Sequence, residues 1–254
     1  MRRTKGLRWV TGSVAVILGL WVCGFPTLAL AKKFSLPTGR GIPGRRESAG
    51  SRQPCLNPET VVDRQGTQSV RLLRTLTALV PQTGYGETVS AYPTFVWHMP
   101  PFTKDVSERR VEFTLQEENV RRPIYQAAFE VADTSGWMSL TLPSLTGLPP
   151  LSPGKAYIWR VRVTCSSEND SYPVASGVIQ RVEASPALMT ALQRARPSDI
   201  PALYIENGVW YEAIATLIQL RRERPRDASL STLWQTWMED PQIQLRQFSS
   251  ISFK

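Results

Sequence analysis

The sequence contains few of the side chains on which metal, redox and nucleophilic sites depend. Among its 254 residues are one histidine, His98, and three cysteines. It has no C-x-x-C pair and no histidine and cysteine at metal-ligand spacing, which argues against a structural metal or a redox centre. The G-x-S-x-G and P-loop motifs are missing too. We therefore expect no catalytic residue, no metal and no cofactor, and keep a hydrolase with an unrecognised site as the last alternative.

Long hydrophobic runs are also scarce, and the main one lies near the N-terminus. Segment 1–31 begins with four basic residues, continues through an apolar run over 9–25, and ends at Ala29-Leu30-Ala31, the small-x-small pattern of a signal-peptidase site. The apolar run is shorter than the ~20 residues of a membrane-spanning helix. We predict a signal peptide cleaved near Ala31, hence a secreted or periplasmic protein without an integral membrane span after cleavage. An uncleaved anchor is the alternative.

Acidic residues are almost absent from positions 1–52, where Glu47 is the single one. This region therefore carries the formal net charge of +9, and from residue 53 onward basic and acidic residues balance. A nucleic-acid binder would distribute its cations along a face or groove, so no nucleic-acid partner is expected. Segment 32–66 is instead predicted to be a basic arm rich in glycine and proline. Its candidate anion-binding residues are Arg40, Arg45, Arg46 and Arg52.

The arm also contains the spacing G-x-G-x-x-G, at Gly39, Gly41 and Gly44. A dinucleotide site with this spacing needs a strand before the first glycine and a helix after the last, and neither pattern flanks these residues. Two interpretations of the arm stay open. It is either a plain linker pinned at Cys55, or a segment whose arginines bind phosphate or carboxylate groups on an anionic cell-wall polymer or a partner.

Two cysteines remain once the signal segment, which contains Cys23, is removed. Cys55 lies in the arm and Cys165 ends a run of alternating apolar residues. An even number of cysteines in an exported chain is typical of a disulfide. We therefore predict a bond between Cys55 and Cys165 that ties the arm to the body of the protein.

Region 67–184 shows period-two alternation in short runs separated by proline, glycine and charged residues. In the clearest run, Trp159 and Val161 alternate with arginines, which predicts a strand with one buried face. Turn signals such as Ser152-Pro153-Gly154-Lys155 separate the runs, and no helical pattern is inserted, which favours an antiparallel sandwich in a mainly β chain. Trp97 and Trp159 are predicted to lie in its core. The predicted strands lie within 70–81, 92–99, 111–115, 125–131, 138–142, 157–165 and 174–182.

From Ser185 the apolar period becomes that of helices. Four helical segments are predicted, at 186–195, 199–207, 209–224 and 229–238, with proline or glycine at the breaks. We interpret 185–240 as a helical region that packs on the sandwich or on a partner, and 241–254 as a tail. Tyr204, Trp210 and Tyr211 are the candidate partner-binding residues.

Two local stretches are similar to known repeats and domains. The stretch LPPLSPGKAYIWRVRV and residues 93–97 resemble fibronectin type III and related immunoglobulin-like domains, which implies a sandwich fold. The helical region resembles one tetratricopeptide repeat, which implies a helical hairpin. The residues that follow this repeat's spacing are Tyr204, Gly208, Trp210, Ala213, Leu217, Leu220 and Pro225.

A third resemblance covers about residues 36–240. In order along the chain, LPTGRGIPGRRESAGSRQPC, LTALVP, YPTFVWHMP, LSPGKAYIWRVRVTC, GVIQRVE and GVWYEAIATLIQLRRERP resemble a cyanobacterial family of exported proteins known as domain of unknown function 928. The resemblance implies export and a shared architecture. It brings no established activity, so no functional residue is carried over.

These features favour a non-catalytic exported module of the cell envelope that holds an envelope protein or peptide through its helices and its arm. The alternative is a module that binds polysaccharide or cell-wall polymer by stacking sugars on surface aromatics. Its candidate residues are Tyr92, Trp137, Trp210 and Tyr211.

Overall fold

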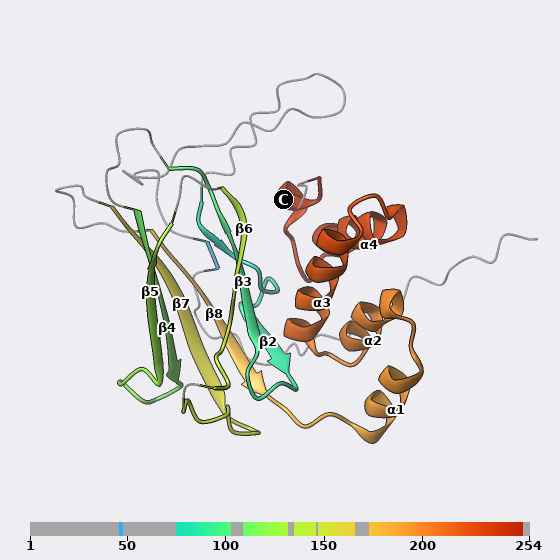
Figure 1. Cartoon of the computed structure of the whole chain (residues 1–254), viewed down its shortest axis with the longest axis horizontal. Coiled ribbons are helices and arrows are strands. Elements are labelled where there is room, and N and C mark those ends of the chain that lie inside the picture. The colour runs from blue at the N-terminus through green and yellow to red at the C-terminus, as the bar shows by residue number, and fades with distance from the viewer. Residues whose placement is uncertain are drawn as a thin grey trace, which may run out of the picture. The chain divides into compact units, whose positions relative to one another are not determined.

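The alternation in the middle of the chain becomes strands with one buried face in the computed structural model of the protein (Figure 1). The structure describes residues 46–47, 75–102, 109–131, 135–145, 147–165 and 173–250, all within the compact unit Lys32–Lys254. The predicted signal segment lies outside these residues. In strand β7, Ala156–Cys165, Trp159 and Val161 are fully buried whereas Arg162 is exposed. The predicted core positions of Trp97 and Trp159 are confirmed.

The described strands form two sheets that face each other. The three-stranded sheet has the order β1-β3-β6 and the five-stranded sheet has the order β2-β8-β7-β4-β5. The pairs are antiparallel, as predicted, with one exception: β2 runs parallel to β8. The bounds are β1 Thr77–Ala78, β2 Tyr85–Thr88, β3 Thr94–Met99, β4 Arg109–Glu117, β5 Tyr125–Glu130, β6 Gly136–Thr141 and β8 Val174–Arg181.

Strand β2 is the element that the sequence pattern does not predict. After β1 has paired with β3, the chain turns at Gly84, whose φ of +74° suits glycine, and then crosses to the edge of the other sheet. The strand has only four residues and includes Gly86. A side chain at Gly86 would lie 3.0 Å from Cβ of Trp210, so the glycine lets a helix approach the strand closely.

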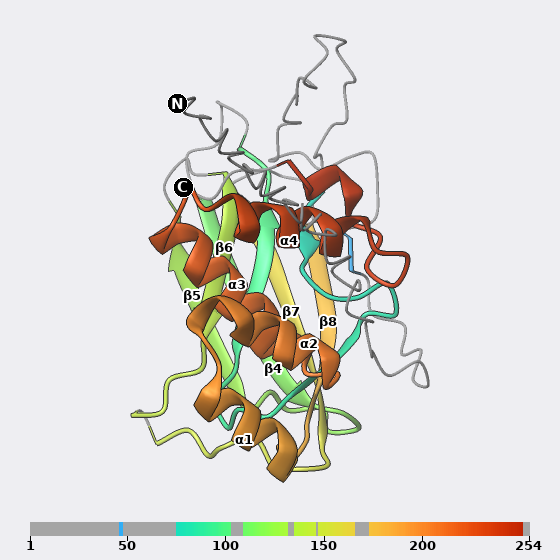
Figure 2. The same cartoon turned by 90° about the vertical axis from the view of Figure 1, so that its right-hand side faces the viewer.

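The helices follow the predicted segments within two residues at each end. They are α1 Pro186–Arg194, α2 Ile200–Glu206, α3 Trp210–Glu223 and α4 Ala228–Glu239, with 3-10 turns η1 Pro197–Asp199 and η2 Arg246–Phe248. Ser185 and Asp227 cap α1 and α4, because each side chain accepts a hydrogen bond from backbone amides of the first turn. Figure 2 shows the helices lying across the sheets. The tetratricopeptide-like assignment of this region stays a prediction.

The three-stranded sheet is the middle of three layers, between the five-stranded sheet and the helices (Figure 1). Both faces of β3 are buried. On one face, the ring of Phe95 lies 5.0 Å from that of Phe113 in the five-stranded sheet. On the other face, the ring of His98 lies 5.2 Å from that of Trp137, which packs 5.3 Å from Trp234 of α4. A middle layer of this kind explains why neither face of β3 is exposed to solvent.

Two sequence predictions need correction at this point. Strands and helices contribute comparable numbers of residues, so the chain is mixed α and β and not mainly β. The segment predicted as a tail is described as far as residue 250, and its Ile243, Leu245 and Phe248 are buried in the same core as the sheets. The reason in both cases is that the helices and the C-terminal segment supply apolar side chains that cover the outer side of the three-stranded sheet.

Polar contacts at the start of α3 attach the helical layer to the sheets. The buried hydroxyl of Tyr211 accepts a hydrogen bond of 2.8 Å from Nε1 of Trp159 and donates one of 3.0 Å to the carbonyl of Val178. Nε1 of Trp210 donates to the carbonyl of Leu79 at 3.0 Å. Burial raises the pKa of the Tyr211 hydroxyl, so it stays a neutral donor.

Glu212 completes this attachment. Its carboxylate accepts hydrogen bonds from the Thr88 hydroxyl at 2.5 Å and from the backbone amides of Val89 and Ser90 at 3.3 and 3.2 Å. Burial raises the pKa of the Glu212 carboxyl, and these donors oppose the shift. The first turn of α3 is therefore bonded to the segment that follows β2.

We expect Tyr211→Phe to lower the free energy of unfolding by about 2 kcal/mol, because it leaves the indole N–H of Trp159 buried without its acceptor. Urea unfolding followed by circular dichroism measures the change. Tyr204→Phe is the matched control, since Tyr204 is only partly buried on the neighbouring helix α2. Equal losses for the two variants would show that the Tyr211 hydroxyl does not hold the layers together.

Candidate functional site

The five-stranded sheet has a polar face that points away from the three-stranded sheet. Along β4, buried apolar residues alternate with exposed or half-exposed polar ones. The register places Arg162 of β7 opposite Glu112, and Gln126 of β5 opposite Thr114. We call this surface the arginine face, which comprises Arg110, Glu112, Thr114, Gln126, Ala128, Glu130, Arg160 and Arg162.

Loose ion pairs connect the charges on the arginine face. Oε1 of Glu112 lies 3.8 Å from Nε of Arg110, and its Oε2 lies 3.9 Å from Nη1 of Arg162. The side chains of Arg110 and Arg162 are 58% and 54% exposed. Arg160 donates to the side-chain oxygen of Gln116 at 3.3 Å. Exposed pairs of this length stabilise a fold by about 0 to 1 kcal/mol, so these charges are not explained by stability.

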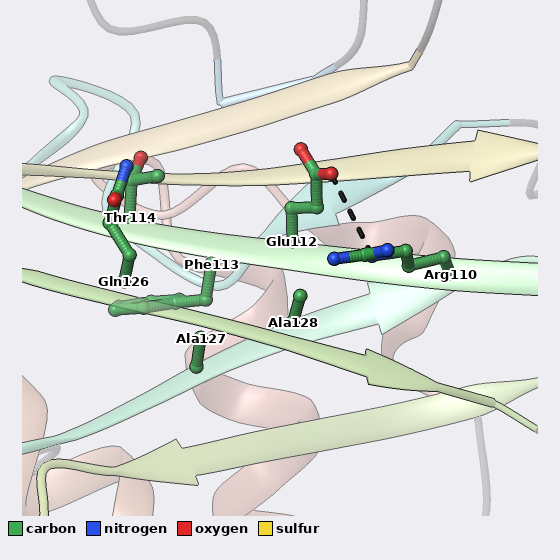
Figure 3. Close-up of a pocket in the computed structure, with 7 residues that line it drawn as sticks. All are labelled: Arg110, Glu112, Phe113, Thr114, Gln126, Ala127 and Ala128. Atoms are coloured by element: carbon green, nitrogen blue, oxygen red, sulfur yellow. Dashed lines mark ion pairs between the residues drawn. The ribbon is translucent and has the colours of Figure 1, made fainter.

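An open hollow of about 340 Å³ lies on this face between β4 and β5. Figure 3 shows Arg110 and Glu112 at one end and Thr114 beside Gln126 at the other. Ala128, whose side chain is short, lies beside Glu112, its register partner on β4. The hollow therefore offers a cation, a carboxylate, a hydroxyl and an amide to one ligand, which suits binding by hydrogen bonds and charge.

Of the four arginines predicted to bind anions, the structure describes Arg46 alone. Its Nη1 and Nη2 donate to the carbonyls of Ile243 and Gln244 at 2.5 and 3.0 Å. Its own carbonyl accepts from the amide of Ala78 at 2.8 Å. Arg46 thus joins β1 to the C-terminal segment, and both of its terminal nitrogens donate to carbonyls within the protein. Arg40, Arg45 and Arg52 lie outside the described residues, and their anion-binding role stays a prediction.

The aromatic candidates lie mostly inside the protein. Trp210 and Tyr211 are 0% and 1% exposed, so neither side chain is accessible to a partner or a sugar. Trp137 is buried as well, against α4. Tyr92 is partly buried, and its hydroxyl donates to the carbonyl of Leu148 at 3.0 Å. Tyr204 is partly exposed on α2, where the predicted partner contact stays a prediction.

The remaining chemical candidates do not form a site in the described part of the chain. His98 is completely buried. Cys55 lies outside the described residues, and only the backbone of Cys165 is described, at the end of β7, so the disulfide stays a prediction. The described residues contain no group of three or more His, Cys, Asp or Glu that could hold a metal. Within them, too, we found no helix with the length and apolar character to cross a bilayer.

The sequence predicts only part of the arginine face. The alternation along β4 and β7 predicts that Glu112, Arg160 and Arg162 point away from the core. It does not predict that β4 lies between β5 and β7, and this order brings the polar residues of three strands together. The pairing depends on contacts between segments far apart in the chain.

The described part of the protein is thus a mixed α and β body built on two packed sheets. Residues 47–253 match the model of the family described as Domain of Unknown Function (DUF928). The chain belongs to this family. A comparison with curated proteins finds no significant match.

Two solved structures show local likeness to the chain. The fn3 domain of human collagen alpha-1(XX) chain is 19% identical, with 37% of this chain and 74% of that one covered and a TM-score of 0.22. The Parabacteroides merdae beta-glucuronidase is 10% identical, with 53% of this chain and 23% of that one covered and a TM-score of 0.23. At these TM-scores neither likeness carries an argument about the present protein.

Proposed function

We propose that this protein is a non-catalytic binding module of the cell envelope that holds an envelope protein or peptide. It is exported by its N-terminal segment and presents an immunoglobulin-like sandwich that carries tetratricopeptide-like helices. The basic arm, through Arg40, Arg45 and Arg52, adds contacts with anionic groups. The observation that carries the proposal is the arginine face, where exposed charges and an open hollow lie on the five-stranded sheet.

The distribution of side chains supports binding over catalysis. His98, the group best suited to general acid or base chemistry, lies between aromatic rings and away from solvent. The Glu212 carboxylate and the Tyr211 hydroxyl, in the first turn of α3, are both engaged in attaching the helices. The polar groups on the arginine face are exposed or half-exposed instead, as expected for contact with a partner.

Affinity capture from envelope extract tests this function. We expect the tagged full chain to retain a partner that an excess of untagged chain displaces in a saturable manner. A panel of ester, glycoside and peptide substrates is measured with the same preparation, and no turnover is expected. Turnover that persists after repurification would contradict a non-catalytic role, and retention that untagged chain does not compete would contradict specific binding.

A further inference from the structure

The arginine face repeats its cations at the period of an extended chain. Arg160 and Arg162 are two residues apart on β7 and point to the same side, which separates their Cα atoms by about 6.6 to 6.8 Å. Arg110 pairs with Thr164, so it is the diagonal neighbour of Arg162, at about 7 to 8 Å. The three cations therefore form a short row across two central strands.

The carboxylates on the same face do not saturate these cations. Glu112 is shared between Arg110 and Arg162 at 3.8 and 3.9 Å, beyond the length of a good charge-assisted hydrogen bond. Glu130 lies opposite Arg110 on β5. Arg160 contacts the neutral Gln116. With three guanidinium groups to two carboxylates, the face favours an anionic ligand.

We infer that the arginine face binds an acidic peptide in the extended conformation, with carboxylates on alternate residues. This inference rests on the proposed function and specifies its partner. Alternate residues of an extended peptide point to one side at about the spacing of the arginines, so successive carboxylates can each accept a fork of N–H donors. A flanking side chain enters the hollow, where Thr114 and Gln126 supply hydrogen bonds.

The lining of the hollow favours a peptide over a sugar chain. Binding modules for polysaccharides stack sugar rings on exposed aromatic faces. The ring of Phe113, the aromatic residue among those that line the hollow, is completely buried in the core. The hollow also lies beside β5, which within the described part of the chain pairs with β4 alone, so one side is open to an extended ligand.

Fluorescence anisotropy with the full chain at low ionic strength tests the inference. The probe is a dye-labelled peptide with glutamate at every second residue and threonine between. A second peptide has the same number of glutamates at every third residue. We expect the first to bind at least about fivefold more tightly, because its carboxylates match the row of arginines.

The double variant Arg160→Gln and Arg162→Gln should weaken binding of the first peptide about tenfold or more. The matched control, Arg194→Gln and Arg226→Gln, removes the same charge from exposed positions in α1 and in the turn between α3 and α4, and should leave the affinity unchanged. Thermal unfolding confirms that both double variants are folded. Arg162→Lys keeps the charge and should still lose affinity, because the planar fork is lost.

Three results would overturn the inference. If the two double variants weaken peptide binding equally, the affinity depends on the net charge of the protein and not on the arginine face. Tighter binding of polygalacturonate than of either peptide would assign the face to an anionic polymer. Absence of peptide binding would exclude this ligand. In each case the capture experiment is repeated with the arginine variants. If they still retain an envelope partner that untagged chain displaces, the proposed function holds and the partner binds at another surface of the protein.

Discussion

The chain carrying Gly177→Ala is expected to unfold with a free energy about 3 to 5 kcal/mol below that of the parent. A Cβ atom at position 177 would lie 2.7 Å from both Nε1 of Trp159 and Cγ1 of Val80. Both neighbours are completely buried, so neither has free space to move into. Displacing the indole would also stretch its hydrogen bond to Tyr211. Urea unfolding followed by tryptophan fluorescence and circular dichroism measures the loss.

Two further variants separate this crowding from other effects of replacing glycine. At Gly147 a Cβ atom meets nothing within 4 Å, and the φ of +75° gives Gly147→Ala a backbone cost of about 1 to 2 kcal/mol. Val80→Ala removes one of the two crowded atoms. It should therefore lower the free energy of unfolding by less in the Gly177→Ala background than in the parent. Crowding would be ruled out by two results together. Gly177→Ala would lower the free energy of unfolding no more than Gly147→Ala does, and the effects of Val80→Ala and Gly177→Ala would be additive.

Local periodicity accounts for the parts of the fold that could be predicted. In β7 and β4 one face meets the core and the other meets solvent, so the alternation of residues predicts the strands and the burial of Trp159. The helical segments were predictable for a similar reason, because their apolar period is local and proline or glycine lies at the breaks between them. These signals act over a few residues and do not depend on the rest of the chain.

Contacts between distant segments decide the parts that could not be predicted. Gly86 interrupts the pattern of β2, and it is there because α3 packs against that strand. Phe248 looks like part of a polar tail in the sequence, yet it fills a space beside Trp137. Arg46 is one of four candidate anion-binding arginines in the sequence, and its hydrogen bond to the carbonyl of Ile243 gives it a structural role. In each case the partner is far away in sequence.

The same long-range packing gives His98 an apolar environment. The imidazole lies 4.9 Å from the ring of Phe248 and 5.2 Å from that of Trp137. Neither ring nitrogen has a hydrogen-bond partner among the described residues. The nearby charged groups of α3 are cations: Arg222 donates to the carbonyl of Trp137 at 3.2 Å, and Arg221 lies over Trp234. No described group is therefore placed to stabilise a protonated His98.

Burial lowers the pKa of His98 from 6.5 to about 4. Above pH 6.5 the imidazole is neutral in both the folded and the unfolded protein, so its titration does not lower the free energy of unfolding. Between pH 6.5 and 4 the unfolded chain binds a proton that the folded chain excludes, so the free energy of unfolding falls by about 3 kcal/mol across this window. Below pH 4, protonation of His98 lowers the free energy of unfolding no further.

The difference between the parent and His98→Leu isolates this effect. Burial raises the pKa of the Glu212 and Glu87 carboxyls, which acts in the opposite direction as the pH falls, but both chains share these residues. Urea unfolding at pH 7.5, 5.5 and 4 should therefore show the parent losing about 3 kcal/mol relative to the variant. Parallel profiles would mean that the folded protein accepts the proton, which requires the C-terminal segment around Phe248 to open and admit water.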